Sequence, residues 1–303
     1  MDAVFTNAKQ WNIAEENGVL SLRYSEKPIP QLDDNQVLVK IHGTSLNFRD
    51  LLISQEKYTF DLKPGVFPGS DGAGTVVAIV KHVTRFQPGD HVVTIIQQQH
   101  LAGSIDARTA KSGLGGSIDG TLRPIGAFDE QWLVAMPQGL SFVEASTLSL
   151  GQCVITQGTG GVSLFAVQFA KSVGARVIAT TSTREKAKFL ENLGADHIGG
   201  PSTLEQSIAS LKLDGLLCVV ESVGSAGQDI KMPHLLDCWV NLFTARGIWV
   251  GSRLQMEEMI RAIEANIDTL RPVVDSVFPL DQVKEAYSYL ACEHLGKVCI
   301  NIE

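Results

Sequence analysis

A glycine-rich turn between an apolar run and an amphipathic segment is the feature that most constrains how this chain can fold. Residues 154–156 are mainly apolar, and the turn Gly158-Thr159-Gly160-Gly161-Val162-Ser163 follows them. From 162 to 173, apolar residues recur at i, i+3, i+4, i+7, i+8 and i+11, a spacing that predicts a helix with one buried face. A second apolar run covers residues 176–181. This succession of strand, turn, helix and strand predicts a βαβ unit and therefore a parallel sheet.

The residue types in this turn favour an anion. Gly158 can adopt the tight turn, Gly160 lets the backbone approach a pyrophosphate, and Ser163 stands where a third glycine would allow close helix–strand packing. The unpaired N–H groups and the dipole at the start of the next helix also attract negative charge. We therefore predict a dinucleotide-binding turn made by Gly158, Thr159, Gly160, Gly161, Val162 and Ser163. An ordinary tight turn within a parallel sheet is the alternative.

The end of the second apolar run indicates which dinucleotide binds. NAD sites usually carry Asp or Glu about 20 residues after the turn, whereas a nearby cation accommodates the 2′-phosphate of NADP. Here Thr181, Ser182, Arg184 and Lys186 occupy this region, and no acid stands at the strand end. We predict that these four residues bind NADPH. In the competing interpretation Arg184 and Lys186 are solvated helix residues, and Ser182 and Glu185 form a capping box.

Composition narrows the class of protein and the compartment. The chain has 303 residues, of which 44% are hydrophobic and 19% charged, typical of a globular protein with room for two domains. A net charge of −8 argues against nucleic-acid binding. No segment is apolar for long enough to span a bilayer, and the start of the chain has no secretory pattern. Five cysteines without a C-x-x-C pair favour a reducing compartment, so we expect a cytoplasmic protein.

The chain divides by the type of element that its patterns predict. Residues 1–145 contain short apolar runs broken by turns, which predict strands, and a loop at 97–123 with little periodicity. Residues 146–265 contain the glycine turn and alternate predicted strands with predicted helices. Residues 266–303 end in a predicted strand, helix and strand, and we expect them to fold back onto the first domain. The predicted fold class is α/β, with a doubly wound parallel sheet beside a β-rich domain.

Several motifs, in one order along nearly the whole chain, carry a family resemblance. They are Asn47-Phe48-Arg49-Asp50, Phe67-Pro68-Gly69-Ser70-Asp71-Gly72-Ala73-Gly74, Phe86-Gln87-Pro88-Gly89-Asp90-His91-Val92, Gly126-Ala127-Phe128, residues 157–163, Gly194-Ala195-Asp196, residues 246–253 and Gly296-Lys297-Val298. With these motifs the chain resembles the medium-chain dehydrogenase/reductase superfamily, in its zinc-independent quinone-oxidoreductase and enoyl-reductase-like branch. The resemblance implies a GroES-like β-barrel domain, a Rossmann domain, a small-molecule substrate in the cleft between them, and a homodimer.

The resemblance also implies a reaction, namely hydride transfer from NADPH to an activated C=C bond or to a quinone or carbonyl substrate. Asn47 is the first candidate for a hydrogen-bond donor to the substrate oxygen, with a turn-forming Asn as the alternative. Tyr58 is a second candidate donor, or a packed loop aromatic. Asp50 is the third catalytic candidate, although ordering of the motif backbone suits it better than a role as base. Arg253 and Lys297 are expected to contact the cofactor, Arg253 alternatively at the domain interface.

The residues predict no metal site. Zinc-dependent relatives place Cys near Ser45 and Gly-His-Glu where this chain has Gly69-Ser70-Asp71, and no cysteine precedes Cys153. Zinc requires three or four ligands at compatible spacing, and the early histidines do not supply such a set.

Two junctions depart from the family pattern. Residues 148–151 run directly into 152–154, where relatives carry a helix and loop that link the domains, and residue 198 is followed directly by 199–201, where relatives place a helix and a central strand. Without that strand we expect weaker cofactor binding and lower stability. An erroneous or alternatively spliced gene model, a diverged variant and omitted segments are competing explanations. A catalytically impaired dinucleotide-binding protein, or a nonfunctional variant, is therefore the alternative function.

Overall fold

The computed structural model describes most of the chain and divides it into two compact units. Unit 1 comprises residues 1–150 and 251–303, and unit 2 comprises residues 151–250. Each unit is considered by itself. The residues described are 7–14, 18–55, 57–58, 61–149, 160–172, 174–175, 177–181, 183–199, 208–209, 211, 213–219, 235–247, 250–292 and 294–303. In this part of the chain no helix is long and apolar enough to cross a membrane.

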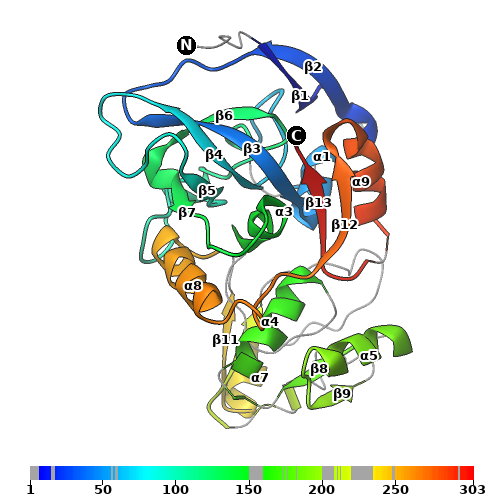
Figure 1. The fold of residues 1–303 in the computed structure, drawn as a ribbon. Coiled ribbons are helices and arrows are strands. Elements are labelled where there is room, and N and C mark those ends of the chain that lie inside the picture. Colours follow the sequence, from blue (N-terminus) through cyan, green and yellow to red (C-terminus); the bar gives the residue numbers. More distant parts are fainter. Residues whose placement is uncertain are drawn as a thin grey trace. The chain divides into compact units, whose positions relative to one another are not determined.

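A seven-stranded sheet forms the body of unit 1 (Figure 1). Its order is β12, β13, β3, β4, β5 and β7, and β6 pairs with β3 outside this path. Among these described strands, β12 and β13 are parallel and the other neighbours are antiparallel. The strands are β3 (Gln36–Leu46), β4 (Asp71–Ile79), β5 (His91–Thr94), β6 (Ile125–Asp129), β7 (Leu133–Ala135), β12 (Val274–Pro279) and β13 (Lys297–Asn301).

Strand β3 explains why this sheet is branched. One edge of β3 pairs with β6 over residues 36–40 and with β13 over residues 43–46, while β4 runs along the other edge. Register shifts at Leu38/Val39 and Ile41/Gly43 locally bend and twist the strand. The resemblance implied a GroES-like β-barrel domain, and the strand pairing in the described residues is a branched sheet that is not closed, because β3 divides one edge between two partners.

The core of unit 1 follows from two periodicities. Val37, Val39 and Ile41 alternate along β3 and are almost fully buried, as expected for a strand with one face in the core. Helix α9 (Val283–Leu290) buries Val283, Ala286, Tyr287 and Leu290, the i, i+3, i+4, i+7 face of a helix. These residues join one hydrophobic cluster with Val298 and Ile300 of β13. The C-terminal segment therefore packs onto the N-terminal strands within unit 1.

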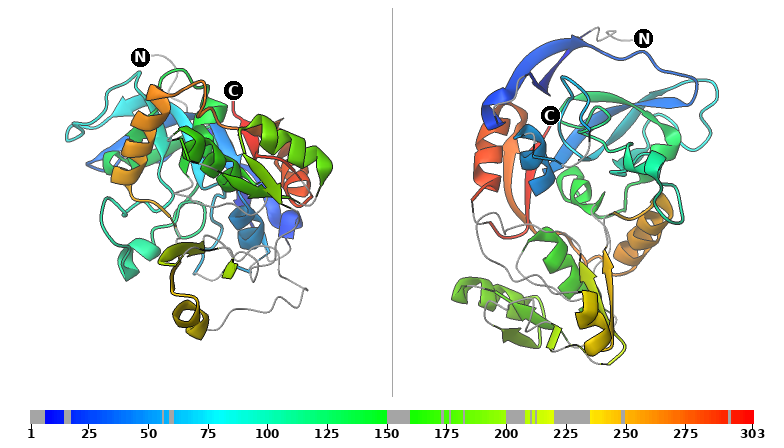
Figure 2. Two further views of the ribbon diagram at one scale, coloured as in Figure 1. Left: turned by 90° about the horizontal axis from the view of Figure 1, so that it is seen from below. Right: turned by 180° about the vertical axis from the view of Figure 1, so that it is seen from behind.

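The remaining elements of unit 1 surround this sheet (Figure 2). The hairpin of β1 and β2 is held to the C-terminal segment by a hydrogen bond from Trp11 Nε1 to the carbonyl of Leu280, at 2.6 Å. The elements are β1 (Asn7–Ile13), β2 (Leu22–Pro28), α1 (Phe48–Ser54), α2 (Ala107–Ala110), α3 (Phe142–Ala145), α8 (Arg253–Ala265) and short 3₁₀ turns at Gly18–Ser21, Glu130–Trp132, Ser146–Ser149 and Leu280–Gln282.

Residues 97–112, here called the glutamine loop, form a hydrogen-bonded structure with little regular secondary structure. Gln97, Gln98 and Ser112 are at most 2% exposed. The Ser112 hydroxyl accepts from the backbone N–H of Gln99 at 3.1 Å and donates to the Thr109 carbonyl at 2.7 Å. The Gln98 backbone N–H donates to the Ser112 carbonyl at 3.1 Å. Neutral hydroxyl and backbone groups thus form most of the hydrogen bonds around the buried side chains of Gln97, Gln98 and Ser112.

Helix α8 begins on this loop. The backbone N–H groups of Arg253 and Leu254 donate to the carbonyls of His100 and Leu101 at 2.9 and 3.1 Å, which satisfies two donors that a helix start leaves unpaired. The sequence analysis placed residues 251–265 with the nucleotide-binding domain, whereas the structure includes them in unit 1. The capping contacts with the glutamine loop account for this difference. The exact limits of the two domains stay a prediction.

Unit 2 contains two pairs of parallel strands with helices between them. Strand β8 pairs with β9, and β10 pairs with β11. This alternation of parallel strands and helices is that of a Rossmann-like domain. The apolar run at 154–156, the junction at 150–152 and residue 200 of the second junction lie outside the described residues. The strand at 154–156 and the loss of a central strand at the second junction therefore both stay predictions. The elements are α4 (Gly161–Ser172), β8 (Ile178–Thr180), α5 (Arg184–Asn192), β9 (His197–Gly199), β10 (Gly215–Val219), α7 (Leu235–Val240) and β11 (Phe243–Gly247).

Candidate active site

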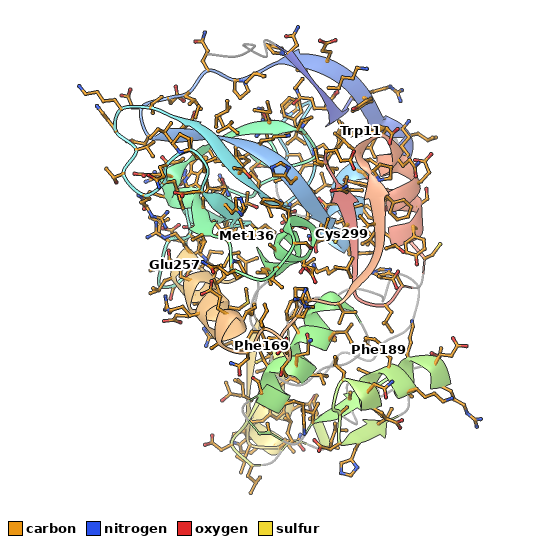
Figure 3. The ribbon with its side chains drawn as sticks, viewed as in Figure 1. Trp11, Met136, Phe169, Phe189, Glu257 and Cys299 are labelled. Carbon is orange, nitrogen blue, oxygen red and sulfur yellow. The ribbon has the colours of Figure 1, made fainter. Side chains whose placement is uncertain are left out.

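Three strands of unit 1 bring polar side chains from distant parts of the sequence into one row. Ser45 on β3 is the register partner of Asp71 on β4 and of Cys299 on β13. Cys299 is labelled in Figure 3. Lys297 lies two residues before Cys299, and Asn47 lies two residues after Ser45 along the antiparallel neighbour. Since side chains two residues apart in a strand share a face, the sheet places Asn47 beside Lys297.

The side chain of Asn47 lies between a cation and an anion. Lys297 Nζ donates to Asn47 Oδ1 at 2.6 Å, and Asn47 Nδ2 donates to Asp71 Oδ2 at 2.7 Å. The hydroxyl of Ser45 donates to the same Asp71 oxygen at 3.1 Å. All four side chains are buried, Asn47 being the most exposed at 8%. We call Ser45, Asn47, Asp71 and Lys297 the Asn47 cluster.

Asp50 supports this cluster from the first turn of α1. Its Oδ2 accepts from the backbone N–H of Asn47 at 2.8 Å, the backbone contact of a capping box. Burial raises the pKa of the Asp50 carboxyl to about 6, although the Arg49 charge and the Asn47 N–H oppose the shift. The sequence analysis favoured a backbone-ordering role for Asp50, and this contact is of that kind. Its catalytic role stays a prediction.

Arg49, buried beside Asp50, is held by three partners. Its NH1 donates to Ser70 Oγ at 2.7 Å and to the Leu114 carbonyl at 2.8 Å. Its Nε donates to the Tyr58 hydroxyl at 3.0 Å, and the guanidinium stacks on the Tyr58 ring at 4.7 Å from its centroid. Tyr58, predicted as a proton donor or a packed aromatic, is thus connected to α1 through Arg49.

Behind α1, the Tyr287 side chain is fully buried in α9. Burial raises the pKa of its phenol well above the usual value, and the Asp50 charge adds to the shift.

In unit 2, the described part of the glycine turn leads into α4. Gly158 and Thr159 lie outside the described residues, whereas Gly160 precedes the helix and Gly161, Val162 and Ser163 form its first turn. A Cβ added to Gly160 would meet no atom within 4 Å, so the backbone there is open to a ligand. Binding of a pyrophosphate at this turn stays a prediction.

The predicted 2′-phosphate site lies where β8 leads into α5. Thr181 is buried, and Arg184 and Lys186 stand in the first turn of α5. The N-cap is Thr183, whose hydroxyl accepts from the Lys186 N–H at 3.3 Å. The expected capping box of Ser182 with Glu185 is therefore wrong by one residue, and Ser182 itself lies outside the described residues. Cations at a helix N-terminus add to its positive potential, which favours an anion.

Asp196 connects the elements around this region. Its carboxylate accepts from the backbone N–H of Val177 at 2.7 Å and forms an ion pair with Lys171 of α4 at 2.9 Å. The Gly194-Ala195-Asp196 motif therefore orders unit 2.

Arg253, predicted to contact the cofactor or the domain interface, has partners within unit 1. Its NH1 donates to the side-chain oxygen of Gln131, and its Nε lies 3.4 Å from Glu257. Its proposed contact with the cofactor stays a prediction.

The position that carries zinc ligands in metal-dependent relatives holds Ser45, Ser70 and Asp71. In the described residues no group of three His, Cys, Asp or Glu side chains could hold a metal ion. Burial raises the pKa of the neighbouring Cys299 thiol to about 12, which favours the protonated form over the thiolate that binds metals. Zinc independence stays a prediction.

Comparison with known proteins agrees with the order of the two domains. Residues 33–138 match the family model of the alcohol dehydrogenase GroES-like domain, and residues 161–224 match that of the zinc-binding dehydrogenases. These matches and the relatives below show that the chain belongs to the medium-chain dehydrogenase/reductase superfamily. It is an oxidoreductase of that family, whose members bind nicotinamide dinucleotides.

Individual relatives cover nearly the whole chain. A zinc-type alcohol dehydrogenase-like protein of Schizosaccharomyces pombe is 35% identical over 339 aligned residues, covering 95% of this chain and 97% of the relative. The NADPH-dependent alkenal/one oxidoreductase of Arabidopsis thaliana is 27% identical over 320 residues, covering 96% of this chain and 79% of that protein. A crystal structure of a protein assigned as an alcohol dehydrogenase from Sinorhizobium meliloti 1021 has a TM-score of 0.87 at 30% identity, covering 99% of this chain and 100% of the other.

The sequence analysis named Asn47, Asp50, Tyr58 and Lys297 but did not propose Asp71 as a functional residue. Asp71 was identified only as part of a motif and as the replacement of a zinc-site residue. The available signal was its place at the start of a strand of otherwise small and apolar residues, where a buried carboxylate requires a polar partner.

Proposed function

We propose that the protein catalyses NADPH-dependent hydride transfer to an activated C=C bond or to a quinone or carbonyl substrate, without zinc. The observation that carries this proposal is the buried Asn47 amide held between Lys297 and Asp71. In a reduction of this class, negative charge develops on the substrate oxygen, and preorganised donors lower the barrier most effectively in a site of low dielectric constant. The Asn47 amide and the Lys297 ammonium are suitable donors.

The cofactor would supply the hydride, and this chain would bind and orient it. Gly160, Gly161 and the first turn of α4 would hold the pyrophosphate, while Arg184 and Lys186 would hold the 2′-phosphate. The location of both cations in the first turn of α5 supports NADPH over NADH. The relative from Arabidopsis thaliana, an NADPH-dependent alkenal/one oxidoreductase, supports the same cofactor and an unsaturated carbonyl substrate.

Steady-state kinetics with NADPH and NADH over a panel of enones and quinones test the proposal. We expect turnover with NADPH, resistance to chelators and no stoichiometric zinc by elemental analysis. Asn47→Ala should lower kcat about 100-fold by removing a donor to the oxyanion, while exposed Asn35→Ala serves as the matched control. Turnover that depends on added zinc would contradict the metal-free mechanism.

The cofactor preference has its own test. Replacing both Arg184 and Lys186 by Gln should weaken NADPH binding about tenfold or more through loss of charged hydrogen bonds. The same change should leave NADH binding within about twofold. Equal weakening of both dinucleotides would contradict a 2′-phosphate site at this helix.

A second candidate function is a dinucleotide-binding protein with impaired catalysis. The 339 positions aligned with the Schizosaccharomyces pombe relative exceed the 303 residues of this chain, so that relative has internal residues without a counterpart here. This difference supports the predicted deletions. NADPH binding by calorimetry without turnover on any substrate of the panel would favour this second function. The predicted homodimer and cytoplasmic location stay predictions.

A further inference from the structure

We propose that Asp71 is a positioning residue that, together with Lys297, fixes and polarises the Asn47 amide for the reduction. This inference rests on the proposed function, in which Asn47 donates to the substrate oxygen. It assigns Asp71, a residue outside the proposed set of catalytic residues, and explains why a carboxylate is buried at the start of β4.

The two partners of Asn47 determine which way its amide faces. A lysine ammonium can only donate, so it must lie against the amide oxygen, and an ionised carboxylate can only accept, so it must lie against the amide nitrogen. The distances of 2.6 Å to Lys297 and 2.7 Å to Asp71 match this orientation. If the amide rotated by half a turn, its NH2 group would face the Lys297 ammonium, donor against donor. Its oxygen would then face the Asp71 carboxylate, acceptor against acceptor. Asp71 and Lys297 therefore select one orientation.

The same two partners strengthen Asn47 as a donor. The ammonium withdraws electron density toward the amide oxygen and makes the amide nitrogen more positive, whereas the carboxylate accepts from one N–H and holds the nitrogen in place. Polarisation of this kind makes the other hydrogen on Asn47 Nδ2 a better donor. Asp71 is 0% exposed and Lys297 5% exposed, and little solvent is present to screen the effect.

Ser45 makes a second contact with Asp71. Comparing this contact with that of Asn47 separates the effect of Asp71 on the position of Asn47 from its effect on packing. Its hydroxyl donates to the same Asp71 oxygen as Asn47, at 3.1 Å, and also lies 3.2 Å from the carbonyl of Ser146. Removing this hydroxyl perturbs the environment of Asp71 but leaves its bond to Asn47. If Asp71 had only a structural role, loss of its contact with Ser45 and loss of its contact with Asn47 would have the same effect on kcat.

The kinetic test is a double-mutant cycle of Asp71→Asn with Asn47→Ala, and Ser112→Ala, which removes a buried hydroxyl outside the cluster, is the control. Ser45→Ala removes the other contact of Asp71 and should lower kcat less than Asp71→Asn. The amide oxygen introduced by Asp71→Asn can still accept from Asn47, so the fold is retained while the charge is lost. We expect Asp71→Asn to lower kcat about tenfold, less than deletion of a full donor, with the Kd for NADPH unchanged. In the Asn47→Ala background the same change should cost less than about twofold, because residues acting through one another are not additive. Equal losses in both backgrounds, or an equal loss in Ser45→Ala, would overturn the proposal.

A measurement independent of turnover keeps this inference separate from the proposed function. With ¹⁵N-asparagine labelling, the Asn47 side-chain signal is assigned by its loss in Asn47→Asp. We expect widely separated shifts of its two amide protons, which converge in Asp71→Asn and persist in Ser45→Ala. An enzyme without turnover but with this pattern would refute the function and retain the positioning. Unchanged shifts in Asp71→Asn would refute the positioning itself.

Discussion

The Asn47 cluster and the glutamine loop are two buried polar regions of unit 1 that satisfy their polar groups differently. The Asn47 cluster joins an ammonium and a carboxylate through one amide, with a second carboxyl, Asp50, below it. In the glutamine loop, the Gln98 side chain donates to the Ile95 carbonyl, and the Ser112 hydroxyl connects the Gln97 side chain, the Gln99 N–H and the Thr109 carbonyl. The Asn47 cluster and the side chains of Gln97, Gln98 and Ser112 are almost completely shielded from solvent.

This difference separates a region suited to chemistry from one suited to stability. Buried charges are costly to desolvate and often stabilise less than apolar residues of the same volume. A neutral network that satisfies its own groups orders the chain without that cost. A fold gains little stability from the Asn47 cluster, and its charges are better explained by a reaction in which charge develops nearby.

The largest difference is expected in the free energy of unfolding, when the loss of a buried charge is compared with the loss of a buried amide. Arg49→Leu removes the donor to Ser70 and to the Leu114 carbonyl and should lower the free energy of unfolding by about 3 kcal/mol. Gln98→Leu, the matched change in the glutamine loop, should lower it by about 1 kcal/mol. Urea denaturation of both variants measures the difference. Equal losses would mean that a buried charge beside the Asn47 cluster and a buried amide in the glutamine loop contribute equally to stability.

The second prediction concerns pH and Asp50. Its folded-state pKa of about 6 lies above the ordinary 3.8, so the folded state binds the proton more tightly than the unfolded state. Its contribution to stability is therefore present below about pH 4 and lost as pH rises through 6. Relative to Asp50→Asn, the native protein should lose at most about 3 kcal/mol between pH 4 and 7. Exposed Asp34→Asn is the control, and a pH-independent difference would contradict the shift.

A third, smaller effect is expected in the glutamine loop. Ser112→Ala removes the hydroxyl that connects Gln99 to Thr109 and should cost about 1 kcal/mol of unfolding free energy. The kcat should not change, in contrast to Asp71→Asn. Exposed Ser104→Ala is the control for both measurements. A tenfold loss of kcat in Ser112→Ala would show that the loop, too, acts on the reaction.

The smallest effect is expected for Arg253 at the start of α8. Its partners Gln131 and Glu257 lie in unit 1, and partly exposed ion pairs contribute little. Arg253→Gln should lower the free energy of unfolding by about 0.5 kcal/mol and leave the Kd for NADPH within about twofold. A larger loss of NADPH affinity would restore Arg253 as a cofactor ligand.

The sequence predicted the individual residues of the site better than the contacts between residues on different strands. Asn47 and Asp50 belong to one local motif, and their backbone contact follows from capping patterns. Lys297 and Asp71 reach Asn47 only through the pairing of β13 and β4 with β3, and that register is a property of the whole sheet. A resemblance could name Lys297, but no local pattern could pair it with residue 47.

In unit 2, by contrast, local patterns were enough to predict some of the elements. The spacing of apolar residues predicted the helix α4, and the apolar run at 176–181 predicted the strand β8, because these patterns are local. The competing interpretation placed the cap of α5 one residue too early, at Ser182, because Ser and Thr are both good N-caps and residue type alone does not decide between them.

The position of β13 has a consequence for biosynthesis. This strand lies between β12 and β3 and carries Lys297, yet a ribosome makes it long after the strands it joins. The sheet of unit 1 cannot be completed while unit 2 is being translated, and the Asn47 amide has no ammonium partner until residues 297–301 have emerged. A nascent chain arrested before this point would expose the edge of β3 to chaperones and to other chains.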